Sequence, residues 1–128
     1  MLVPTRIYAR SVAALFEAGP PVRSICHVTG GGIPGNLPRV LPEGLGARID
    51  LASYARPAIF DLLAKRGPIE ESEMRNVFNL GVGLLVVVDR AAAADAIAVL
   101  AARGERAWAI GEVTTVAAGT PFEERVTF

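Results

Sequence analysis

The residue types best suited to chemistry gather between His27 and Arg39, where a short apolar run opens into three glycines and then Pro-Gly-Asn. Glycine lacks a Cβ, so such a segment can turn several backbone N–H groups toward one ligand and accept positive φ. We expect an anion, most often phosphate, to bind these amides, with Arg39 as a planar donor. The amides concerned are those of Thr29, Gly30, Gly31 and Gly32. A plain tight turn between two elements stays open as the alternative.

Three side chains of the same segment are further candidates. His27, the single histidine, could protonate or hydrogen-bond a substrate near neutral pH, and a structural role is its alternative. Asn36 could orient a substrate amide or hydroxyl group. Cys26 alternates to the opposite face of the strand from His27. With no second histidine to activate it, we expect Cys26 to be a core residue rather than a nucleophile.

A second glycine segment runs from Asn79 through Gly81 to Gly83. Two glycines framing the start of a strand are typical of a place where the backbone approaches something closely. A simple helix-to-strand turn is the alternative. Glu70, Glu71 and Glu73 fall just before this segment, in the first turn of an expected helix, and we interpret them as a solvated face that favours the helix dipole. No His or Asp completes a ligand set there, so we predict no metal site.

A dinucleotide site is excluded, although Gly30, Gly32 and Gly35 satisfy G-x-G-x-x-G and Asp50 follows at a suitable offset. That fold needs a long helix that starts inside the fingerprint. Prolines and glycines interrupt the segment and limit any helix before Asp50 to about two turns; they are Pro34, Pro38, Pro42, Gly44 and Gly46.

Composition sets broader limits. A chain of 128 residues forms one domain with a real core, and its hydrophobic content of 52% and mean hydropathy of +0.40 predict that another domain or subunit covers part of its surface. The 13 basic and 13 acidic residues are interspersed and give no sign of nucleic-acid binding. The longest apolar run, Val82–Val88, is only as long as a strand, so we expect no membrane span. The single cysteine fits a reducing cytoplasm, and no signal peptide is recognised.

The elements that must position these residues follow from hydrophobic periodicity and from the Gly and Pro stops. After an extended entry (2–8), we expect four helices, at 11–18, 57–66, 70–77 and 90–103, and at most one helical turn at 36–40. Five strands are expected at 24–29, 47–51, 83–88, 106–113 and 122–128. The strand, helix and strand from 83 to 113 predict a right-handed crossover onto one sheet. The fold class is α/β or α+β, a mixed sheet with helices packed on it.

Taken together, these residues resemble the C-terminal domain of the aminoimidazole ribonucleotide synthetase (phosphoribosylformylglycinamidine cyclo-ligase) family. The resemblance covers about residues 2 to 113 and rests on segments in the family's order and spacing. They are 4–8, 27–33 with Asn36, Pro38 and Arg39, 40–47, Glu73-Met74, 78–83, Gly104-Glu105, Ala107-Trp108 and 110–113.

The resemblance implies the fifth step of purine synthesis. ATP, with Mg, activates the formyl amide oxygen of formylglycinamidine ribonucleotide, and an internal nitrogen closes the imidazole ring with release of ADP and phosphate. Family members are homodimers whose N-terminal domain supplies most of the ATP site. No acidic Gly-Gly-Glu-Thr-type motif of that domain occurs here. We therefore expect residues 1–128 to be a C-terminal substrate-cleft domain, inactive alone.

The resemblance also implies roles for particular residues. Thr29 to Gly32 and Asn36 would line the cleft near the substrate or the transferred phosphate, with His27 beside them as a polar or acid–base group. Asn79 to Gly83 would close the same cleft, and Thr5, Arg6 and Tyr8 would lie at the junction with the N-terminal domain. A stand-alone anion-binding or regulatory module is a rival interpretation. A relative such as a selenophosphate synthetase or a hydrogenase-maturation protein ranks last, because its glycine segment reads differently. We expect Gly31→Val to remove anion binding with little effect on folding.

Overall fold

The computed structural model describes residues 4–128, which group into two compact units. The first unit consists of the chain up to Ile25 together with Val86–Ala109, and the second of Cys26–Leu85 together with Ile110–Phe128. The expected entry segment 2–8 begins outside the described residues. Among residues 4–128, no helix combines the length and apolar character that crossing a membrane requires.

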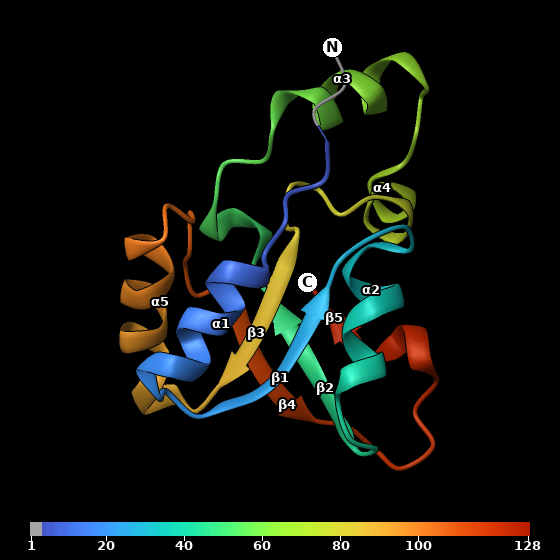
Figure 1. Ribbon diagram of the computed structural model, residues 1–128. Helices are drawn as coiled ribbons and strands as arrows, with labels where there is room; N and C mark the ends of the chain where they lie inside the picture. Colours follow the sequence, from blue (N-terminus) through green and yellow to red (C-terminus); the bar gives the residue numbers. More distant parts are fainter. Residues whose placement is uncertain (1–3) are drawn as a thin grey trace. The chain divides into compact units, whose positions relative to one another are not determined.

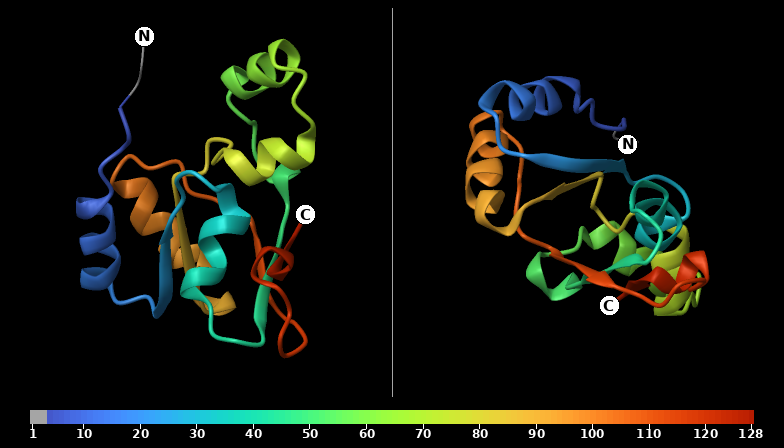
Figure 2. Two further views of the ribbon diagram at one scale, coloured as in Figure 1. Left: turned by 90° about the vertical axis from the view of Figure 1, so that its right-hand side faces the viewer. Right: turned by 90° about the horizontal axis from the view of Figure 1, so that it is seen from below.

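The first unit is built on two helices that lie side by side, α1 (Ala9–Ala18) and α5 (Ala93–Ala102) (Figures 1 and 2). Most of strands β1 (Val22–His27) and β3 (Leu84–Val88) also belongs to it, and the two strands pair as one sheet. Helix α1 ends as predicted, because Gly19 adopts a left-handed φ of 83° and closes the last turn.

A largely buried carboxylate, that of Glu105, connects the segment before α1 with the turn after α5. Glu105, whose side chain is only 12% exposed, pairs with Arg6 at 2.8 Å and accepts a 2.6 Å hydrogen bond from Ser11. Arg6 also donates to the carbonyl of Gly104. Burial, and then the charge of Glu105, raises the pKa of Tyr8. Two of the expected junction residues thus surround this carboxylate within the first unit.

The second unit contains a mixed three-stranded sheet in the order β4 (Gly111–Thr115), β2 (Leu45–Ile49), β5 (Val126–Thr127). The central strand β2 runs antiparallel to β4 and parallel to β5, with Ala47 opposite both Val113 and Val126. Ala47 and Ile49 are buried, as their alternation with charged residues predicts. The α+β class with a mixed sheet is therefore confirmed.

Short helices complete the molecule. The second unit holds the α-helices α2 (Gly32–Asn36), α3 (Ala58–Arg66) and α4 (Glu71–Val77) and the 3₁₀ helices η1 (Leu37–Val40), η2 (Leu51–Ser53) and η4 (Phe122–Arg125). The first unit adds η3 (Arg90–Ala92), which leads into α5. Helices α1, α3, α4 and α5 thus match the four expected ones to within three residues at each end.

The predicted crossover is wrong. β3 pairs with β1, whereas β4 pairs with β2, so the strands on either side of α5 lie in different sheets. The later strand begins only at Gly111, where a Cβ would collide with the carbonyl of Arg48 on the neighbouring strand. The last strand is also shorter than predicted, because η4 takes up the residues before Val126.

The glycine segment is helical sooner than expected. Helix α2 starts at Gly32 and continues directly into η1, so 32–40 holds two short helices rather than one turn at 36–40. Pro34 does not prevent this, because it stands in the first turn, where a backbone N–H has no helical partner to lose.

Adjacent residues of α1 offer a test of its packing. Leu15 is 0% exposed and Phe16 is 63% exposed. We predict that Leu15→Ala lowers the free energy of unfolding by about 2–5 kcal/mol, because it leaves a cavity. Phe16→Ala should change it by no more than about 0.5 kcal/mol. Urea denaturation measures both, and equal effects would contradict the described orientation of α1.

Candidate functional site

The structure brings the two glycine segments together inside the second unit. The amide of Val28 donates to the carbonyl of Gly83 at 3.0 Å, and the amide of Gly31 donates to the carbonyl of Val77 at 3.3 Å. Residues 29–32 and 79–83 therefore flank one another, and their lining of one ligand site stays a prediction.

The close contact in this region is between Gly32 and the C-terminal end of α4. Gly32 is buried with a φ of 60°, and a Cβ there would lie 2.9 Å from the carbonyl oxygen of Phe78 and still closer to that of Arg75. Only glycine leaves room for these two oxygens. The role that the structure shows for Gly32 is thus the packing of α2 on α4.

The amides predicted to bind an anion divide into two pairs. Gly31 and Gly32 donate within the protein, to the carbonyls of Val77 and Thr29 respectively. The amides of Thr29 and Gly30 have no hydrogen-bond partner in the part of the chain that the structure describes, and both residues are exposed. Anion binding stays a prediction, and the backbone donors open to it are these two.

The side chain of Asn36 holds the first glycine segment, residues 29–32, through hydrogen bonds to its backbone. Asn36 is 6% exposed. Its side-chain amide nitrogen donates to the carbonyls of Gly30 at 3.1 Å and Gly32 at 2.7 Å. Its amide oxygen accepts a long 3.5 Å hydrogen bond from the hydroxyl of Thr29. Both amide hydrogens are thereby engaged. The structure shows a bracing role for Asn36, and its contact with a substrate group stays a prediction.

The second segment is a tight turn held by Asn79. The side-chain oxygen of Asn79 accepts from the amide of Gly81 at 3.0 Å, and its carbonyl accepts from Val82 at 2.9 Å. Leu80 has a φ of 51°, a left-handed conformation that costs a bulky residue about 1–3 kcal/mol. Its carbonyl accepts a 3.0 Å hydrogen bond from the hydroxyl of Tyr54. A Cβ at Gly81 would come within 2.7 Å of two ring carbons of Pro57, so this glycine is also required by packing.

Cys26 and His27, just before the first glycine segment, differ in burial, as their alternation along the strand predicts. Cys26 is 3% exposed, and burial raises the pKa of its thiol despite the opposing charge of Arg39. The interpretation of Cys26 as a core residue is confirmed. His27 is exposed at the end of β1, and Arg39 is exposed on η1. Both stay candidates for contact with a ligand.

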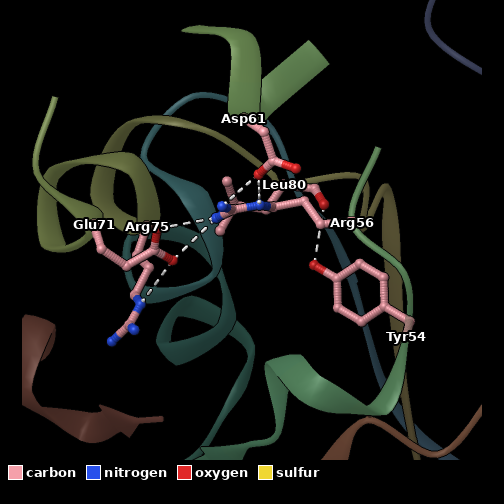
Figure 3. A network of polar contacts seen from close by, with 6 residues as sticks. All are labelled: Tyr54, Arg56, Asp61, Glu71, Arg75 and Leu80. Carbon is pink, nitrogen blue, oxygen red and sulfur yellow. Dashed lines mark hydrogen bonds and ion pairs between the residues drawn. The ribbon is translucent and has the colours of Figure 1, made fainter. Parts of the chain in front are cut away.

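A charged network beside the turn was missed by the sequence reasoning (Figure 3). Arg56 binds Asp61 at 2.7 Å and both carboxylate oxygens of Glu71 at 3.0 Å, and Arg75 approaches Glu71 at 3.4 Å. These hydrogen bonds raise the pKa of Arg56. The solvated-face interpretation is therefore incomplete for Glu71. Only the i, i+4 spacing of Glu71 and Arg75 hinted at a pair.

The network borders a hollow of about 350 Å³. Its other lining residues are Leu51, Ala52, Tyr54 and Leu80. Burial raises the pKa of Tyr54, which keeps its hydroxyl protonated and able to donate to Leu80. Across residues 4–128, no group of three or more His, Cys, Asp or Glu side chains is arranged to hold a metal ion.

Comparison with known proteins decides the family. The sequence model of the family "AIR synthase related protein, C-terminal domain" matches residues 1–122. The chain belongs to this family. The phosphoribosylformylglycinamidine cyclo-ligase of Sorangium cellulosum (strain So ce56) is 60% identical to it over 129 aligned residues. The alignment covers 100% of this chain and 37% of that relative, so the chain spans little more than a third of the relative's length.

The match to the AIR synthase C-terminal domain family, over residues 1–122, extends into both compact units. The candidate residues from His27 to Arg39 and from Asn79 to Gly83 all lie in the second unit. Thr5, Arg6 and Tyr8 lie in the first, where Arg6 and Tyr8 surround Glu105. Their place at a junction with another domain stays a prediction.

Two glycines of α2 provide a matched test of the packing contact. We predict that Gly32→Ala lowers the free energy of unfolding by about 3 kcal/mol or more, because the methyl group forces α2 off the carbonyls of α4. Gly35→Ala should change it by no more than about 1 kcal/mol, since a Cβ there meets nothing within 4 Å. Thermal and urea unfolding measure both variants. A tolerated Gly32→Ala would show that α2 and α4 do not pack this closely.

Proposed function

We propose that this chain is the C-terminal, substrate-cleft domain of an ATP-dependent cyclo-ligase of purine synthesis. The enzyme would convert formylglycinamidine ribonucleotide to aminoimidazole ribonucleotide by closing the imidazole ring, with release of ADP and phosphate. The observation that carries this proposal is 60% identity, over the whole of this chain, with a protein of that name. The apposed glycine segments, with exposed Thr29 and Gly30 whose amides have no partner among the described residues, support only the anion-binding part of the proposal.

The proposal assigns different tasks to the two parts of the enzyme. ATP and Mg would be held mainly by the N-terminal part. ATP would supply activation of the formyl amide oxygen. The present domain would bind and orient the ribonucleotide and exclude water from it.

Within this domain, the free amides of Thr29 and Gly30 would donate to the substrate's phosphate or to the phosphate being transferred. Asn36 would keep these amides in place through Gly30 and Gly32. Arg39 would add charge, and His27 would be a polar or acid–base group beside them. The rigid turn from Asn79 to Gly83 would form the opposite wall.

The partners follow from the same proposal. The ribonucleotide is the small-molecule substrate, the N-terminal domain is the direct protein partner, and the full-length enzyme is a homodimer. We place the enzyme in the cytoplasm, in keeping with a single reduced cysteine, Cys26, that is buried.

The first prediction from this proposal concerns turnover. The chain alone should release no ADP from ATP and formylglycinamidine ribonucleotide, because phosphoryl transfer depends on groups positioned around the phosphates. Joining it to the N-terminal part of the Sorangium cellulosum relative should restore aminoimidazole ribonucleotide formation. Product made by the purified chain alone would contradict the proposal. A joined protein that binds phosphate but never turns over would favour the stand-alone anion-binding module.

The second prediction concerns the anion. Titration with inorganic phosphate should shift the amide NMR signals of Thr29 and Gly30 most. A Cβ at Gly30 meets nothing within 4 Å, so Gly30→Val should fold, block approach to these amides and weaken binding about tenfold or more. The control Gly35→Ala should bind as the parent chain does. Equal binding by Gly30→Val would remove Thr29 and Gly30 from the site.

The expected mild effect of Gly31→Val on folding is corrected by the structure. Gly31 has a φ of 94°, and its amide donates to the carbonyl of Val77. Valine is β-branched and strained at this φ. The change would therefore destabilise the fold and confuse loss of binding with loss of structure, and Gly30 is the better position for the test.

A further inference from the structure

Helix α3 carries an apolar stripe that the described chain leaves uncovered. Ile59, Leu62 and Leu63 are 54%, 44% and 37% exposed. Their i, i+3, i+4 spacing puts them on one face of the helix. None of the nine residues of α3 is buried. Every member of the stripe, defined here as Ile59, Leu62 and Leu63, is thus partly exposed.

The other sides of α3 account for its position. Its inner side presents Phe60, whose ring lies 6.0 Å from that of Phe78. Asp61, on a third side, is bound by Arg56, which also binds Glu71 of α4. Figures 1 and 2 show α3 beyond α4 and apart from the three-stranded sheet of the second unit. The helix is held beside α4, and Ile59, Leu62 and Leu63 remain partly exposed.

A helix of nine residues with none of them buried is poorly stabilised. Isolated helices shorter than about 12–15 residues are marginal in water, and most helical stability in proteins comes from burial of an apolar face. Ion pairs as exposed as those of Arg56 each contribute at most about 1 kcal/mol. A surface that covers Ile59, Leu62 and Leu63 would supply the missing burial.

We propose that this stripe docks on an apolar surface of the N-terminal part of the cyclo-ligase. The inference rests on the proposed function. In the Sorangium cellulosum relative, the matched region is 37% of the protein, so most of that enzyme lies outside it. The family matched is by description a C-terminal domain, which puts the remainder before it.

The size of the stripe favours this occupant over a second copy of the chain. A stable interface between separate proteins buries about 800 Å² on each partner, far more than three partly exposed side chains can offer. A covalently linked partner is present at millimolar effective concentration and needs no such area. The stripe suits a contact within one polypeptide.

The test uses a fusion in which this chain replaces the matched region of the Sorangium cellulosum enzyme. The photo-crosslinking residue p-benzoyl-phenylalanine takes the place of Leu62, and a matched fusion carries it in place of Lys65, on the polar side of α3. After irradiation, mass spectrometry identifies the linked peptides. We expect position 62 to link to the N-terminal part within one polypeptide and position 65 to give at least fivefold less product.

The alternative outcomes are distinct. Links between two copies through position 62, no links from it, or equal links from both positions would each overturn the docking proposal. The turnover of the parent fusion is measured in parallel. An active fusion without the expected link leaves the cyclo-ligase proposal standing and removes the docking surface. A linked but inactive fusion supports docking and counts against the proposed activity.

Discussion

The arrangement of the second unit depends on the absence of one methyl group, at Gly32. The carbonyl oxygens of Arg75 and Phe78, at the end of α4, occupy the space that a side chain would need. This contact sets α2 against α4 and allows the carbonyl of Val77 to accept from Gly31. The turn at Asn79 follows α4 directly, so the same contact also fixes where the second glycine segment meets the first.

Local chemistry made much of this visible in the sequence. Glycine and proline stops placed the ends of α1 and α3, and the alternation from Ala47 to Leu51 identified the central strand β2. The burial of Cys26 followed from alternation along β1. The family resemblance, rather than local chemistry, placed the two glycine segments at one cleft; the structure brings them side by side through the hydrogen bond from Val28 to Gly83.

What the sequence could not supply were contacts made over long distances along the chain. Strand pairing around α5 was misread because local pattern does not say which sheet a strand joins. Arg56 meets Glu71 only after the turn between α3 and α4 has formed, and no spacing rule covers fifteen residues. The glycine run correctly predicted positive φ, which Gly31 and Gly32 adopt. It did not predict that both residues contact carbonyl groups at the end of α4.

The three glycines therefore differ in their surroundings, which the glycine motif alone does not reveal. Gly32 packs against the carbonyls of Arg75 and Phe78, and the amide of Gly31 donates to the carbonyl of Val77. Gly30 faces outward with open space at its Cβ position and a free amide, beside that of Thr29. Asn36 connects the two halves, because it holds the carbonyls of both Gly30 and Gly32. The proposed anion site would use amides that adjoin these packed glycines, so packing and the proposed binding depend on the same three-glycine segment.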